Sequence, residues 1–218
     1  MSFLEILRHS VRGIEILALV VGLFYTSSSS PKNVRSFVVF IGGIVIIELV
    51  GWYLYEYKLY QQNVWFYKYF GFPFQYIFLF TFFCKILFPT KWYKWVIVLV
   101  SIYIISLIVE NNLLNRSGYA WMSISFTIAN VLLLVLVITY IYQLAISDQI
   151  IEFKTNPIFW FSVGIFIYYL GGFPFYGMFN YLYYNFPKLH LIYYEIVMGL
   201  SCLMYVFFII GFLWQRRN

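Results

Sequence analysis

The chain has 218 residues, of which 63% are hydrophobic and 10% are charged, and its mean hydropathy is +0.83. This composition is typical of a membrane protein, and the polar gaps are too short to form a water-soluble catalytic domain. The net charge of +6 comes from 14 Lys and Arg residues that form no run, which argues against a nucleic-acid-binding surface.

Seven apolar segments follow one another with short polar gaps, and about 20 such residues cross the hydrocarbon core of a bilayer as one helix. We therefore predict an all-α fold, a single transmembrane domain over residues 1–218 with seven spanning helices and short loops. The predicted helices cover about residues 4–26, 36–56, 65–88, 92–110, 118–145, 157–179 and 189–214. We expect the first segment to be a retained span, since Glu5 and Glu15 lie in or near it and no clear cleavage site follows.

Proline and asparagine mark several of the predicted ends. Ser30-Pro31 ends the first segment, and Pro89 separates the third from the fourth. Asn156-Pro157 is a favourable helix start, because asparagine caps free amides and proline at the first helical position loses no hydrogen bond.

Basic residues near the segment ends set the expected orientation. An odd number of spans places the termini on opposite sides of the membrane. The C-terminal side collects Lys32, Arg35, Lys85, Lys91, Lys94, Lys154, Arg216 and Arg217, and the N-terminal side collects Arg8, Arg12, Lys58, Lys68, Arg116 and Lys188. This excess of 8 over 6 predicts a bacterial inner-membrane protein with its N-terminus outside and its C-terminus in the cytoplasm.

Aromatic residues are abundant, with 22 Tyr and 25 Phe, and Tyr and Trp crowd the segment ends. The stretches at residues 52–69 and 179–194 are the densest. Amphipathic rings favour the headgroup layer, so these stretches are interpreted as aromatic belts. An aromatic-lined pocket for an apolar or ring-shaped ligand is the alternative.

The tetrapeptide Gly-Phe-Pro-Phe occurs twice, with Pro73 in the third segment and Pro174 in the sixth. A proline inside a span frees a carbonyl and bends the helix, so both prolines are candidate hinges. Paired interruptions in an inverted repeat are typical of transporter binding sites. Two independent kinks in a chain of such biased composition are the alternative.

Three glutamates lie within predicted spans, where a carboxylate is costly and faces protein or water. Glu48 shares a helix face with Gly51, Glu195 with Gly199, and Glu15 with Gly22. Small residues allow neighbouring helices to approach closely, so we expect these acids to face the bundle interior. Asn130, near the middle of the fifth segment, is the expected hydrogen-bond partner of Glu48 in an internal polar anchor. A purely structural interhelical hydrogen bond remains the alternative to a ligand, ion or proton site.

Other chemistries find little support. Cys84 and Cys202 are isolated within apolar segments, so neither a disulfide framework nor a metal site is expected. His9 and His190 have no spacing that favours haem ligation. No paired acid–base set of an intramembrane enzyme is present, so we predict a non-enzymatic protein without cofactor or metal.

Three stretches carry a resemblance to known proteins: IELVGWYL at 47–54, NVWFYKYFGFPFQYIFLF at 63–80 and KTNPIFWFSVGIFIYYLGGFPF at 154–175. They resemble a poorly characterised group of seven-helix membrane proteins of Bacteroidota, often found beside two-component sensor histidine kinases. The resemblance covers most of the chain but brings no established catalytic residues. It implies a sensory or accessory role next to a kinase.

We therefore expect a membrane sensor or accessory subunit. It would bind an apolar or lipid-like ligand, or a partner's membrane helix, and act on another membrane or cytoplasmic protein. A small proton-coupled transporter or channel is the first alternative, and a structural subunit of a larger envelope complex is the second. Its expected partners are thus the lipid bilayer and one such protein, without nucleic acid.

Overall fold

The computed structural model describes residues 3–114, 121–147 and 153–215, and within these ranges the chain forms helices and turns without a strand. The α-helices are α1 (Phe3–Tyr25), α2 (Lys32–Glu56), α3 (Tyr60–Phe66), α4 (Phe72–Leu87), α5 (Trp92–Val109), α6 (Ser123–Ala145), α7 (Pro157–Gly177), α8 (Phe179–Asn185) and α9 (Pro187–Trp214). Two π-helical segments, η1 (Tyr67–Gly71) and η2 (Glu110–Leu114), follow α3 and α5. The all-α prediction is confirmed for the described part of the chain.

Six of the described helices are long and apolar enough to cross a membrane. They are Lys32–Glu56, Tyr60–Leu87, Trp92–Asn112, Ser123–Ala145, Pro157–Gly177 and Pro187–Trp214, so α3, η1 and α4 count as one span. Helix α1 is the expected seventh and has 23 residues, but its composition does not qualify it. Every stretch of 18 residues in α1 includes at least three of Glu5, Arg8, Arg12 and Glu15.

Several observed ends differ from the predicted ones. Helix α2 begins at Lys32, because the carbonyl of Pro31 already accepts the amides of Val34 and Arg35. The expected span 157–179 is divided at Met178, where α7 ends and α8 begins. The expected start of the fifth span at residue 118 lies outside the described residues, and α6 begins at Ser123.

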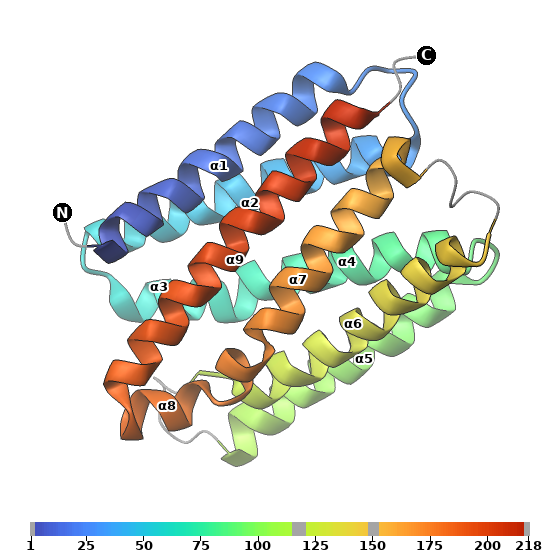
Figure 1. Cartoon of the computed structure of the whole chain (residues 1–218). Coiled ribbons are helices and arrows are strands. Elements are labelled where there is room, and N and C mark those ends of the chain that lie inside the picture. Colours follow the sequence, from blue (N-terminus) through green and yellow to red (C-terminus); the bar gives the residue numbers. More distant parts are fainter. Residues whose placement is uncertain (1–2, 115–120, 148–152, 216–218) are drawn as a thin grey trace.

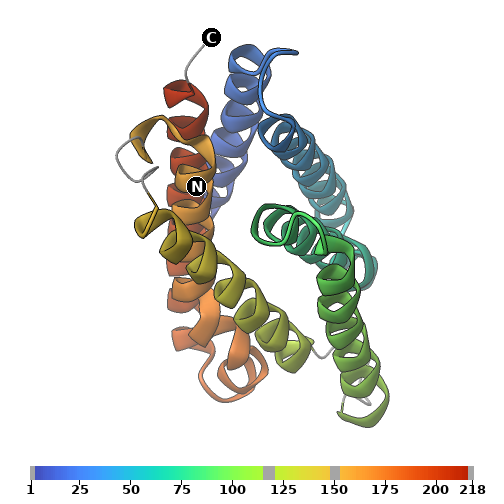
Figure 2. The same ribbon diagram turned by 90° about the vertical axis from the view of Figure 1, so that its right-hand side faces the viewer.

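The long helices lie side by side in two layers (Figures 1 and 2). Helices α6, α7 and α9 form one layer and α2, α4 and α5 the other, with α1 beside α2 and α9. The beginning of α1, the α2–α3 turn and α8 lie at one end of the bundle, which we call the N-terminal end. The α1–α2 turn and the end of α9 lie at the opposite end, as an odd number of passes requires.

Phenylalanine rings and close helix contacts form the core. The Phe37 ring of α2 stacks on the Phe161 ring of α7 with centroids 4.0 Å apart, and Phe40 stacks on Phe78 of α4 at 4.3 Å. A Cβ at Gly211 would lie 2.7 Å from the Phe161 ring, so glycine is what allows α7 and α9 to approach here. Close packing around aromatic rings therefore holds the two layers together.

Candidate functional site

Glu15 is the most deeply buried of the three predicted acids, with 2% of its surface exposed. It lies on the face of α1 that contacts α2 and α9. Ala18, one turn on, is fully buried, and a Cβ at Gly22 would lie 3.0 Å from the Phe212 ring of α9. The predicted inward direction of Glu15 is therefore confirmed.

Glu48 is half-buried on α2, and its Oε2 accepts a hydrogen bond from the Tyr67 hydroxyl at 2.9 Å. Gly51 makes this contact possible, because a Cβ at that position would overlap the Tyr67 ring. The Asn63 amide also donates to the Gly51 carbonyl at 2.5 Å. The spacing of Glu48 and Gly51 thus marks the place where α3 and η1 dock on α2.

Glu15 and Glu48 lie close enough to each other to interact electrostatically, and Arg12 acts on both. We call Arg12, Glu15, Glu48 and Tyr67 the acid cluster. It holds two carboxyl groups beside one guanidinium. Glu15 Oε1 has no hydrogen-bond partner among the described residues, so the cluster includes a buried polar atom whose hydrogen-bonding capacity is not used within it.

Two arginines at the start of α1 lie over aromatic rings of its neighbours. The Arg8 guanidinium is 5.1 Å from the ring centre of Tyr55 on α2 and 5.8 Å from that of Tyr194 on α9. Arg12 lies 5.6 Å from the Trp52 ring. Cation–π contacts of this kind stabilise a desolvated charge, so α1 has partners for its cations within the bundle.

A small internal cavity lies next to the acid cluster. Its lining comes from α2, α4, α7 and α9: Phe40, Ile41, Ile44, Gln75, Leu79, Ile165, Tyr169, Met204, Tyr205 and Phe208. It has room for about one water molecule. The Tyr169 hydroxyl is buried without a hydrogen-bond partner among the described residues. Tyr205 lines the cavity and also interacts with Glu15, so it connects the cavity to the acid cluster.

Asn130 is fully buried on α6, but it does not pair with Glu48 as expected. Its Oδ1 accepts a hydrogen bond from the Tyr76 hydroxyl of α4, and its Nδ2 has no partner among the described residues. The rings of Tyr103 and Tyr169 lie 5.3 and 6.0 Å from the Tyr76 ring. We call Tyr76, Asn130, Tyr103 and Tyr169 the amide cluster. The expected anchor is thus divided between two sites with different partners.

Glu195 differs from the other two acids. It is only partly buried on α9, and no hydrogen bond of its side chain is found within the described ranges. Gly199, one turn on, is exposed, and a Cβ there would meet nothing within 4 Å. The expectation that Gly199 marks a helix-packing face is therefore wrong.

The two prolines occupy different positions in their helices. Pro73 lies near the middle of the span Tyr60–Leu87, as the second residue of α4 after the π-helical segment η1. Pro174 lies in the last turn of α7. These positions are not equivalent, which favours two independent interruptions over an inverted repeat. The hinge role of both prolines stays a prediction, and π-helical segments such as η1 are frequent at functional sites.

Sequence reasoning missed Glu110, which is 2% exposed in η2. Its carboxylate accepts hydrogen bonds from the backbone amides of Ile124 and Ser125, at 3.0 and 2.7 Å, and from the Ser125 hydroxyl. It thus caps the free amides at the start of α6 from another helix. The local signal was an acid at the end of an apolar segment, but its partner lies across a loop.

No group of three or more His, Cys, Asp or Glu residues that could hold a metal ion occurs in the described ranges. Comparison with protein-family models, with curated proteins and with solved structures gives no match. The resemblance to the Bacteroidota proteins therefore stays a prediction.

Proposed function

We propose that the chain crosses the bacterial inner membrane seven times, with α1 as the first span, its N-terminus outside and its C-terminus in the cytoplasm. At 1.5 Å per residue α1 is roughly 35 Å long, enough to cross the hydrocarbon core. Its composition is too polar for a helix surrounded by lipid. Burial of Glu15 and the ring contacts of Arg8 and Arg12 support a span whose charges are covered by α2 and α9.

The proposed orientation rests on the distribution of basic residues. Lys32, Arg35, Lys85, Lys91, Lys94 and Lys154 lie at or near the end where α9 terminates. Arg216 and Arg217, which are expected to face the cytoplasm, lie outside the described residues. Lys and Arg collect on the cytoplasmic side of membrane proteins, which supports this end as the inner one.

Within this topology we propose a non-enzymatic sensor or accessory subunit that acts on a cytoplasmic partner, such as a sensor kinase. The observation that carries the proposal is the acid cluster, where side chains of α1, α2 and η1 meet and Tyr205 of α9 joins them. At the far end of α9, the Gln215 amide donates to the Ser30 hydroxyl at 2.7 Å. A change at the cluster would therefore shift α9 against the α1–α2 turn at the proposed cytoplasmic face.

Complementation of a deletion strain tests this role. The gene is deleted in its host, the changed transcripts are measured, and variants are reintroduced. Glu48→Gln and Glu48→Ala should reach the membrane in normal amounts but fail to restore the transcript pattern. Glu195→Gln is the matched control and should restore it. Full restoration by both Glu48 variants would overturn the role of the cluster.

A proton-coupled transporter is the second candidate, favoured by the buried Glu15 and the half-buried Glu48, which Tyr205 connects to the internal cavity, and by the π-helical segment before Pro73. Proteoliposomes loaded with a pH-sensitive dye separate the two functions. The sensor moves no protons when a pH gradient is applied. Proton flux in the unchanged protein that is lost in Glu48→Gln would show that the protein is a carrier and would reject the sensor function.

A structural subunit of an envelope complex is the third candidate, favoured by the span Trp92–Asn112, of which only 6% is buried in the bundle. A helix so exposed has a free side for a partner's helix as well as for lipid. Stoichiometric co-purification with one membrane protein, unaffected by Glu48→Gln, would favour this candidate over the sensor.

A further inference from the structure

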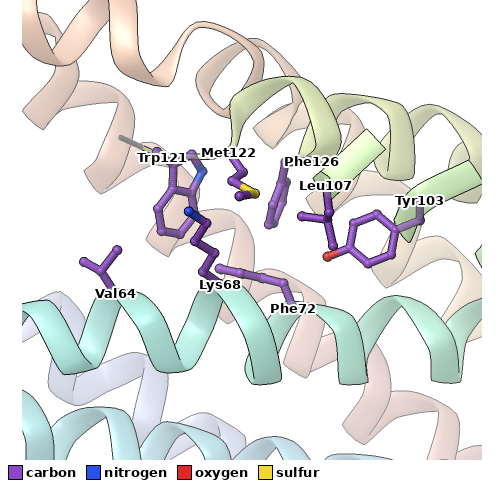
Figure 3. A pocket seen from close by; sticks show the side chains of 8 residues that line it. All are labelled: Val64, Lys68, Phe72, Tyr103, Leu107, Trp121, Met122 and Phe126. Atoms are coloured by element: carbon purple, nitrogen blue, oxygen red, sulfur yellow. The ribbon is translucent and has the colours of Figure 1, made fainter. Parts of the chain in front are cut away.

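A second pocket lies toward the N-terminal end of the bundle, away from the acid cluster (Figure 3). Residues of α3, η1, α4, α5 and the start of α6 line it: Val64, Lys68, Phe72, Tyr103, Leu107, Trp121, Met122 and Phe126. The space between these side chains is about 310 Å³ when its open side is included, and its enclosed part has room for about one water molecule. We call it the Lys68 pocket. All but one of these residues are apolar or aromatic, as is usual for sites that bind small apolar molecules.

Lys68 brings an uncompensated positive charge to this pocket. Its ammonium donates to the Asn111 Oδ1 at 3.0 Å and lies 5.1 Å from the centre of the Tyr69 ring. Neither partner carries a charge, and Lys68 forms no ion pair with another described residue. Glu110, next to Asn111, already accepts three hydrogen bonds from α6. A lysine within a span is costly unless an anion accompanies it.

Trp121 supplies a second donor at the same pocket. Its indole N–H is buried without a hydrogen-bond partner among the described residues. Its backbone is held on both sides by Asn180, which accepts from the Trp121 amide at 3.1 Å and donates to its carbonyl at 2.7 Å. Figure 3 shows the Lys68 ammonium directed toward the Trp121 ring, with Phe72 and Phe126 beyond them. Two residues that line the same apolar pocket therefore each carry an N–H donor, one of them charged and the other without a partner.

We propose that the Lys68 pocket binds an amphiphilic anion, a carboxylate or phosphate head on an acyl chain. The head is held by Lys68 and Trp121, and the chain leaves through the open side of the pocket, against the apolar side chains that line it. An anion without an acyl chain would gain no binding energy from the apolar side chains of the pocket. An uncharged chain would leave the Lys68 and Trp121 donors without an acceptor. The open side of the pocket lets the rest of the chain continue into the bilayer.

The position of Lys68 also connects this ligand to the acid cluster. Lys68 follows Tyr67 in η1, and the two side chains contact different helices. Tyr67 donates to Glu48 of α2, whereas Lys68 donates to Asn111 of η2. An anion that draws Lys68 away from Asn111 would therefore act on the segment that carries Tyr67. This role in signalling rests on the proposed function, but binding itself does not.

Quenching of tryptophan fluorescence by bromine tests the binding. The whole protein is reconstituted in phosphatidylcholine nanodiscs and titrated with 9,10-dibromostearate. We expect saturable quenching, and the saturable part should be absent in Trp121→Phe. Lys68→Gln should weaken the apparent affinity at least tenfold, and Lys68→Arg should keep it within about threefold. Lys188→Gln, at the same end of the bundle but outside the pocket, is the control and should bind like the unchanged protein.

Two further arms identify the source of the anion. Uncharged dibromostearyl alcohol should bind at least tenfold more weakly than dibromostearate. In nanodiscs made with brominated phosphatidylglycerol, quenching of Trp121 would show that a bilayer lipid occupies the pocket. If unbrominated stearate relieves that quenching, a free fatty acid and a lipid headgroup bind at the same site. Leu107→Trp fills the pocket and should abolish the saturable quenching in a folded protein.

Equal affinity in Lys68→Gln and Lys188→Gln, or unchanged quenching in Trp121→Phe, would overturn the proposal. The result that would reject the sensor function differs from the result that would reject binding. In that case dibromostearate would still bind through Lys68, while the Glu48 variants restored the transcript pattern of the deletion strain.

Discussion

The acid cluster and the amide cluster differ in how they accommodate polar side chains within the bundle. Both place polar side chains inside a bundle of apolar helices. The amide cluster joins the spans Tyr60–Leu87 and Ser123–Ala145 through a neutral hydrogen bond between Tyr76 and Asn130. The acid cluster instead gathers two carboxyl groups and a guanidinium where the most polar long helix, α1, contacts α2. Charge inside this bundle thus marks the helix that depends most on protein contacts and least on lipid.

Removal of the cation from the acid cluster should have the largest effect. Arg12→Met leaves the carboxyl groups of Glu15 and Glu48 without their positive neighbour and removes the contact of Arg12 with the Trp52 ring, and the loss of the partner of a buried charge costs up to about 3–5 kcal/mol. Thermal unfolding can be followed with a thiol-reactive dye, because Cys84 is buried; a Cys202→Ser background removes the partly exposed thiol. The double variant Arg12→Met/Glu15→Gln should recover part of the loss.

Arg35→Met is the control, since Arg35 is exposed on α2. If Arg12→Met unfolds at the same temperature as this control, the charges of α1 do not stabilise the bundle, and the contrast between the two clusters disappears.

A methyl group at Gly51 should have the next largest effect. Gly51→Ala displaces Tyr67 from Glu48, and overpacking of this kind costs about 1–3 kcal/mol. Gly199→Ala is the matched control, because its Cβ meets open space and alanine favours a helix. We expect Gly199→Ala to unfold at or above the temperature of the unchanged protein. The opposite order of the two variants would show that η1 does not dock on α2 as described.

The amide cluster should give the smallest effect. Tyr76→Phe and Asn130→Leu each remove one partner of a single hydrogen bond, and hydrogen bonds between membrane helices contribute about 0.6–1.7 kcal/mol. A double-mutant cycle over the two sites isolates this interaction. Tyr142→Phe, at an exposed position on the same helix as Asn130, should change nothing. A coupling energy as large as the effect of Arg12→Met would show that neutral and charged clusters contribute equally.

The spans could be predicted from the sequence, but their environment could not. Trp92–Asn112 and Ser123–Ala145 have similar hydropathies of 2.1 and 2.4, yet 6% of the first and 50% of the second is buried. Lipid tails and a protein core are equally apolar, so hydropathy does not distinguish them. The inward direction of Glu15 was predictable from Gly22, because small residues do pack there. The same reasoning fails for Glu195, since no helix lies against Gly199.

The hydrogen-bond partners of the polar side chains were harder to predict than the positions of these side chains in the helices. Tyr67 belongs to an aromatic-rich stretch that resembles a membrane belt, and its hydrogen bond with Glu48 depends on the contact of α3 and η1 with α2. The pairing of Asn130 with Tyr76 depends on the contact between α4 and α6, which no local pattern encodes. Glu110 likewise reaches α6 only through the folded arrangement of η2.

Labelling of introduced cysteines tests most directly whether α1 crosses the bilayer with its charges covered by α2 and α9. In a Cys84→Ser/Cys202→Ser background, one cysteine is placed in an extension ahead of Met1, and another by Ser29→Cys in the exposed α1–α2 turn. A membrane-impermeant maleimide added to intact spheroplasts should label the N-terminal cysteine at once, and Ser29→Cys only after the membrane is permeabilised. Labelling of both cysteines from the same side would contradict the account, because α1 would then lie on the membrane surface.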